Sequence, residues 1–137
     1  MKKVLTLSKE QSRLLYSLLL VNQVKNRSDN RKRFRFLEVF EDFVFKFEDE
    51  LLKFADKKSS EVKDELEKLS KETKEFIFKD REIFAYGKDL FEKSFDKGTK
   101  VKNPMGKIEE SPLVGRNAKI YMELEDVFMD VKESKKD

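Results

Sequence analysis

The chain has 137 residues, of which 43% are charged and 38% hydrophobic, and its 31 basic side chains nearly balance 28 acidic ones. A chain of this length supports one hydrophobic core, so we expect a single domain over residues 1–137 that ends in a disordered tail at 134–137. The absence of His, Cys and Trp excludes zinc fingers, thiolate nucleophiles, Ser-His-Asp triads and disulfides. No segment approaches the roughly 20 apolar residues of a membrane span. We therefore expect a soluble, cytoplasmic protein.

The first 86 residues contain neither Gly nor Pro, which favours helices there. Ser8 and Gln11 have the spacing of a capping box, in which each side chain bonds the backbone amide of the other residue. A first helix is therefore predicted from Lys9 to about Lys25. The polar segment 26–30 predicts a turn followed by a new helix cap at Ser28 or Asn30.

The next segment, from Arg31 to about Lys57, is rich in Phe. Its apolar residues follow alternating spacings of three and four, the pattern of a helix that packs along one side: Leu37, Phe40, Val44, Phe47, Leu51 and Phe54. Residues 43–47 also alternate like a strand, but the helical spacing continues over the whole segment, so we favour a helix. A third helix is predicted from Ser59 or Ser60 to Phe76, antiparallel to the second.

The remaining elements are predicted less uniformly. Residues 76–86 fit either a small β-hairpin or a continued helix, and Gly87 is expected to end both. A short helix at 88–96, an extended connection at 99–110 and a last helix from Ser111 to about Glu133 follow. The predicted fold is thus mainly α, a four- to five-helix bundle around an antiparallel hairpin at 31–76, with a possible minor β-hairpin at 76–86.

Charge is distributed unevenly along the chain. Residues 1–36 carry ten Lys or Arg and two acidic residues, a net of +8, so the remainder carries −5. The densest part of this basic region comprises Arg27, Arg31, Lys32, Arg33 and Arg35. These side chains either bind nucleic-acid phosphates or pair within the fold with acidic segments such as 48–50 and 109–110. No nucleic-acid-binding motif accompanies the cluster, so nucleic acid is the alternative partner.

The Phe-rich helix predicts a second kind of contact. Three of its apolar residues, Phe34, Phe45 and Leu52, lie away from the main apolar stripe. These residues are either buried within the bundle or exposed for contact with another protein or a second copy. A single helix in a small bundle cannot bury every face within its own chain, so we favour the contact.

Enzymatic chemistry is not expected. Carboxylates that share helical faces, such as Glu38 with Asp42 and Glu123 with Asp126, fit a solvated surface better than a Mg²⁺ site, because nothing predicts their convergence. A Gly-rich phosphate loop is absent from the sequence. We therefore predict no catalytic residues, no metal and no cofactor.

The segment Arg31-Lys32-Arg33-Phe34-Arg35-Phe36-Leu37-Glu38, the Lys/Glu-rich middle, Lys79-Asp80-Arg81-Glu82 and the Leu/Glu-rich last helix resemble small uncharacterised accessory proteins of tailed phages and mobile elements. The resemblance implies a non-enzymatic module in the host cytoplasm that binds and modulates a host or viral protein. It brings no catalytic residues. A homodimer formed through the Phe-rich helix is part of the same hypothesis.

Overall fold

The computed structural model describes residues 2–21, 25–54, 57, 59–96, 99–102, 108–111 and 115–134. The mainly helical class is confirmed. The helices are α1 (Lys9–Val21), α2 (Arg27–Leu52), α3 (Ser59–Ser70), α4 (Arg81–Asp96) and α5 (Gly115–Met129). The strands are β1 (Lys2–Ser8), β2 (Thr73–Phe78), β3 (Thr99–Lys102), β4 (Ile108–Ser111) and β5 (Lys132–Ser134).

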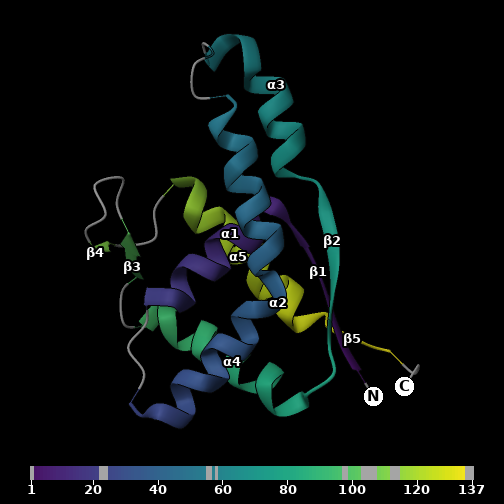
Figure 1. Cartoon of the computed structure of the whole chain (residues 1–137), viewed down its shortest axis with the longest axis vertical. Helices are drawn as coiled ribbons and strands as arrows, with labels where there is room; N and C mark the ends of the chain where they lie inside the picture. The colour runs from purple at the N-terminus through teal and green to yellow at the C-terminus, as the bar shows by residue number, and fades with distance from the viewer. Residues whose placement is uncertain are drawn as a thin grey trace.

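Helices α2 and α3 form the antiparallel hairpin, which stands upright in Figure 1 with α1 and α5 behind α2. Asn26 caps α2, because its side chain accepts a 2.9 Å hydrogen bond from the amide of Asp29. The cap therefore precedes the expected Ser28 and Asn30, which lie inside the helix. Residues 43–47 are helical, as the longer apolar pattern predicts.

Strand β1 is the central strand of a three-stranded antiparallel sheet, with β2 on one side and β5 on the other. Leu5 lies opposite Phe76 in the β1–β2 pairing, and Lys2 lies opposite Ser134 in the β1–β5 pairing. Strands β3 and β4 form a separate two-stranded antiparallel sheet. Figure 1 shows β1 and β2 running together along one side of the helical hairpin.

The core is built around aromatic rings where α2 meets β2 and α4. The ring of Phe36 stacks on that of Phe78 at 5.1 Å, and the ring of Phe40 lies 4.7 Å from that of Phe76. Leucines of β1 and α1 complete this cluster. Four of the six residues of the predicted stripe are buried in α2 together with Phe36: Phe36, Leu37, Phe40, Val44 and Phe47. Leu51 is only partly buried, and Phe54 lies beyond the end of α2.

The junction between β1 and α1 is held by polar contacts. Ser8 and Gln11 form the predicted capping box, with the amide of Ser8 donating to Oε1 of Gln11 at 3.0 Å and the amide of Gln11 donating to Oγ of Ser8 at 3.2 Å. Beside it, the side chain of Lys9 is only 7% exposed and reaches Glu50 at 3.0 Å and Glu72 at 2.8 Å. Lys9 thus joins the start of α1 to the end of α2 and to the α3–β2 connection.

Residues 76–86 contain the end of a strand and the beginning of a helix, and the predicted hairpin does not form within them. Phe76 to Phe78 belong to strand β2, which pairs with β1 rather than with a neighbouring segment, and residues 81–86 are helical. Thr73, expected in the third helix, is the first residue of β2. Gly87 does not end an element but lies inside α4, where a Cβ atom would overlap the ring of Phe36.

Several element ends also differ from the prediction. Helix α1 ends at Val21 rather than near Lys25, α2 ends at Leu52 rather than near Lys57, and α5 spans Gly115–Met129. Ser134, expected in a disordered tail, belongs to β5 because its backbone pairs with β1. Residues 112–114 and 135–137, part of the predicted last helix and tail, lie outside the described residues.

Candidate functional site

Three exposed apolar side chains lie on one line along α2. Phe34 is 42% exposed, Phe45 45% and Leu52 70%. Phe34 and Leu52 are 18 residues apart, about five helical turns, and Phe45 lies within about 20° of the line that joins them. These are the residues that the sequence predicts for partner binding, and they form a stripe on the side of α2 that faces away from the core.

Helix α1 widens this stripe. The ring of Tyr16 packs edge-on against Phe45, with the centroids 5.8 Å apart, and Leu20 lies one turn further along α1 with its side chain exposed. We call the surface formed by Tyr16, Leu20, Phe34, Phe45 and Leu52 the α2 face. Sequence reasoning missed Tyr16, because only the packing of α1 on α2 brings it beside Phe45.

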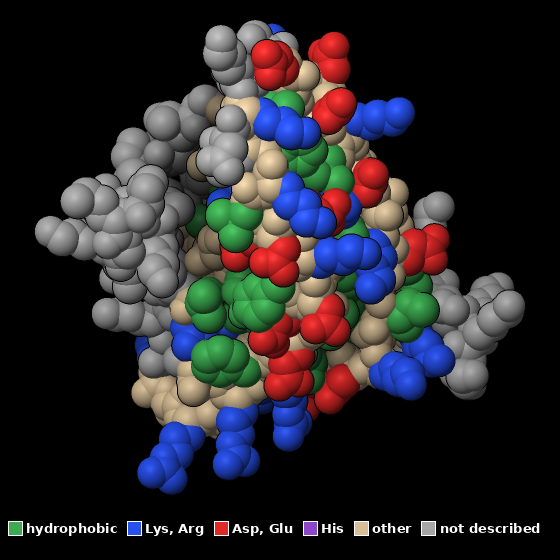
Figure 2. Space-filling view, turned by 45° about the horizontal axis from the view of Figure 1, so that its top comes forward, with side chains coloured by type: hydrophobic (Ala, Val, Ile, Leu, Met, Phe, Trp, Pro, Cys, Tyr) green, Lys and Arg blue, Asp and Glu red, His purple; other side chains and the backbone are tan. Residues whose placement is uncertain are grey.

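Carboxylates surround the middle of the α2 face. Glu38, Glu41, Glu48 and Asp49 all lie within about 60° of the apolar line on α2. Burial, with the nearby charges of Glu41 and Glu48, raises the pKa of the Tyr16 phenol. Figure 2 shows hydrophobic and acidic side chains interspersed over the middle of the view, with basic side chains at the lower end and others over the upper half and the right side.

The structure separates the five residues of the predicted basic cluster into two that contact other elements and three that are exposed. Lys32 pairs with Glu82 of α4 at 3.0 Å, and the hydrogen bond and charge of that carboxylate raise the pKa of Lys32. Arg33 turns toward the end of α1, where Nη1 donates to the carbonyl of Leu20 at 3.2 Å. Lys32 and Arg33 therefore contact other elements of the same chain.

The other three members of the cluster, Arg27, Arg31 and Arg35, are exposed near the beginning of α2. Arg27 and Arg31 continue the line of the α2 face toward its N-terminal end, because they lie within about 60° of that line. The face is consequently basic at one end and acidic from Glu38 to Asp49.

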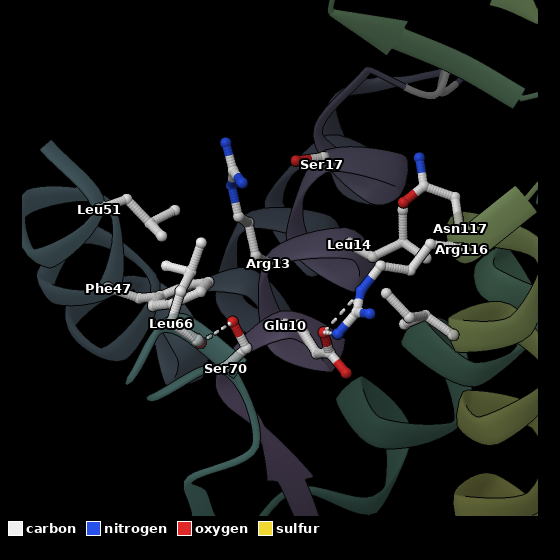
Figure 3. A pocket seen from close by; sticks show the side chains of 11 residues that line it. Glu10, Arg13, Leu14, Ser17, Phe47, Leu51, Leu66, Ser70, Arg116 and Asn117 are labelled. Carbon is white, nitrogen blue, oxygen red and sulfur yellow. Dashed lines mark hydrogen bonds and ion pairs between the residues drawn. The ribbon is translucent and has the colours of Figure 1, made fainter. Parts of the chain in front are cut away.

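A separate pocket of about 380 Å³ opens above α1, between the α2–α3 hairpin and α5 (Figure 3). Its apolar walls are formed by Leu14, Phe47, Leu51, Leu66 and Ile120. Arg116 donates from Nε to Oε2 of Glu10 at 3.2 Å, and Arg13 lies 3.8 Å from Glu48. The charged side chains around this pocket are therefore engaged with one another, and they do not define a ligand class.

The described residues form neither a metal site nor a membrane-spanning helix. No group of three or more Asp or Glu side chains there is placed to hold a metal ion. In the same part of the chain, no helix is both long and apolar enough to cross a membrane.

The chain was also compared with known proteins. Its sequence matches no protein-family model and no curated protein, and its fold matches no solved structure. Function is therefore inferred from the residues and their contacts, among which the α2 face is the most distinctive feature.

Proposed function

We propose that this protein is a non-enzymatic accessory module that binds another protein through the α2 face. The observation that carries the proposal is the line of Phe34, Phe45 and Leu52, three large apolar side chains left exposed on one side of one helix. Because 43% of the residues are charged, three large apolar side chains exposed on one line stand out on the surface of this protein.

Physical chemistry supports the choice of this surface. Large apolar side chains contribute most of the free energy at protein interfaces. Their transfer out of water is favourable by about 25 cal/mol for each Å², and this gain must exceed the entropic cost of association. The carboxylates around Phe45 would form the polar rim that such interfaces have. The resemblance to accessory proteins of tailed phages favours a host or viral protein in the host cytoplasm as the partner.

A capture experiment tests this proposal. The tagged protein is incubated with nuclease-treated lysate of the organism that encodes it, and retained proteins are identified by mass spectrometry. The double variant Phe45→Ser/Leu52→Ser should lose the specific partner. Met122→Ser is the matched control, because Met122 is an exposed apolar residue on α5. The control should retain the partner.

Circular dichroism melts should show that both variants remain folded. A partner retained equally by the wild type and the double variant would contradict binding through the α2 face.

Nucleic-acid binding is the second candidate, because Arg27, Arg31 and Arg35 are exposed together near the start of α2. It predicts binding to DNA or RNA at about 50 mM salt that weakens sharply by about 200 mM. Binding releases counterions from the phosphates, and this release becomes less favourable as the salt concentration rises. The variant Arg31→Glu/Arg35→Glu should abolish that binding while leaving the Lys32 and Arg33 contacts in place. Fluorescence anisotropy measures the affinity, and binding that persists in the variant would eliminate this candidate.

A further inference from the structure

We infer that a second copy of this chain binds to the α2 face, with the two α2 helices antiparallel about a two-fold axis near residues 39 and 40. The inference rests on the proposed function, since it identifies a second copy of the chain as one protein that the α2 face binds. Two features of α2 support it: the spacing of its exposed aromatic residues and the order of its charges. The length of α2 sets the expected strength.

The aromatic spacing makes the face complementary to itself. Phe34 and Phe45 lie at equal distances on either side of the midpoint between residues 39 and 40. In an antiparallel pair with that midpoint, Phe34 of one copy lies opposite Phe45 of the second copy, and symmetry repeats the contact. The same arrangement places Arg27 opposite Leu52, where the aliphatic part of the Arg side chain can cover the leucine.

The charges fix the direction of the pair. Arg31 and Asp49 are exposed and lie 18 residues apart, about five turns, so both are on the same side of the apolar line. Antiparallel packing brings Arg31 of one copy near Asp49 of the second copy at both ends of the contact. Parallel packing would instead place arginine against arginine and carboxylate against carboxylate. Opposite charges across the contact therefore favour the antiparallel orientation.

The length of α2 and the charges at its centre set the expected strength. A helix of 26 residues is about 39 Å long, which places the contact at the low end of specific interfaces, below about 1,200 Å² in total. Near the two-fold axis, the same midpoint places Glu38 of one copy opposite Glu41 of the second copy, and this repulsion opposes association. A reversible dimer follows, and Glu38→Gln should strengthen it.

Sedimentation equilibrium at about 10 to 200 µM protein measures the association. Arg31→Glu and Asp49→Arg should each weaken the dimer at least tenfold, whereas the double variant Arg31→Glu/Asp49→Arg should return it to within about threefold of the wild type. Lys63→Glu is the control, because Lys63 is an exposed cation on α3 away from the face. A failure of the double variant to recover would overturn the Arg31–Asp49 pairing.

Because the chain has no Cys, single-cysteine cross-linking can test the register directly. When the Arg27→Cys and Leu52→Cys variants are mixed in equal amounts and oxidised, the disulfide between the two variants should exceed either self-linked product at least fivefold. Predominant self-linked products would overturn the antiparallel arrangement.

A chain that is monomeric at the highest concentration would also overturn the dimer. If that monomer still captures a partner that the Phe45→Ser/Leu52→Ser variant loses, the proposed function stands without the dimer. If neither association occurs, both proposals fail.

Discussion

Gly87 in the middle of α4 lies directly against the aromatic ring of Phe36 on α2, with no room for a Cβ atom between them. Gly normally weakens a helix, so its presence at a buried helical position reflects close approach of the two helices. The ring of Phe36 also stacks on Phe78 of β2. This contact therefore joins α4, α2 and the sheet.

Gly87→Ala is expected to destabilise the protein, although Ala is the better helix former by about 1 kcal/mol. The added methyl group must displace the Phe36 ring within a packed core, at a net cost of about 1–3 kcal/mol. Urea unfolding measures the change. Phe36→Leu/Gly87→Ala should lose less stability than the sum of the single variants. A higher melting temperature in Gly87→Ala would contradict the packing.

Lys9→Met should lower stability near neutral pH by about 1–3 kcal/mol, because it removes charge-assisted hydrogen bonds from a nearly buried ammonium group. Burial lowers the pKa of Lys9, but the hydrogen bonds and charges of Glu72 and Glu50 outweigh it and raise that pKa. The hydrogen bond and charge of Lys9 lower the pKa of Glu72.

The pH dependence of this stability difference follows from the directions in which the pKa values of Lys9 and Glu72 are shifted. The contribution of Lys9 is complete below its unfolded pKa of about 10.4 and disappears as the pH rises through the higher folded value. The contribution of Glu72 is complete above its unfolded pKa of about 4.3 and disappears as the pH falls through the lower folded value. Urea unfolding is measured from pH 3 to pH 11, about the range over which both groups titrate. The difference in unfolding free energy between wild type and Lys9→Met should be constant near neutral pH and should decrease toward both ends of the range. A difference that stays constant across that range would contradict the ion pairs.

Arg33→Met should cost about 1–2 kcal/mol, because the guanidinium bonds carbonyl groups at the end of α1 and adds positive charge beside a helix C-terminus. The matched control is Arg35→Met, which removes an exposed arginine from the same segment. Thermal unfolding should show a lower melting temperature for Arg33→Met and almost no change for Arg35→Met. Equal effects at the two positions would contradict the division of the basic cluster.

Tyr121→Phe should cost about 0.5–1.5 kcal/mol, since its hydroxyl donates to the buried carbonyl of Phe91 at 2.9 Å. The aromatic stacking of Tyr121 on Phe91 is retained in this variant. Unfolding in guanidinium chloride measures the difference. Phe91 lies in α4 and Tyr121 in α5, so an unchanged midpoint would mean that this bond does not help to join the two helices.

The local patterns of the sequence predict the helices well where spacing and capping agree. The stripe from Leu37 to Phe47 predicts the buried side of α2, and Ser8 with Gln11 predicts the start of α1. The exposed positions of Phe34, Phe45 and Leu52 follow from the same helical geometry. These features depend on residues close together in the chain.

Features that depend on distant residues were not predictable in this way. The sequence predicts no element at residues 2–7, yet they form a strand because two distant segments pair with it. The residues around Gly87 predict the end of an element there, because the sequence does not show that the distant Phe36 packs against this glycine. The uneven charge of the cluster at 27–35 likewise could not show that Lys32 pairs with Glu82 or that Arg33 bonds the end of α1.

The central position of β1 has a consequence for the order of folding. β1 is synthesised before both of its partner strands, of which β2 ends at Phe78 and β5 ends at Ser134. The three-stranded sheet can therefore be completed only after residue 134 has left the ribosome, whereas the α2–α3 hairpin can form earlier. Contacts this distant in sequence slow folding, so this protein should fold more slowly than a helical bundle of equal size built from local contacts.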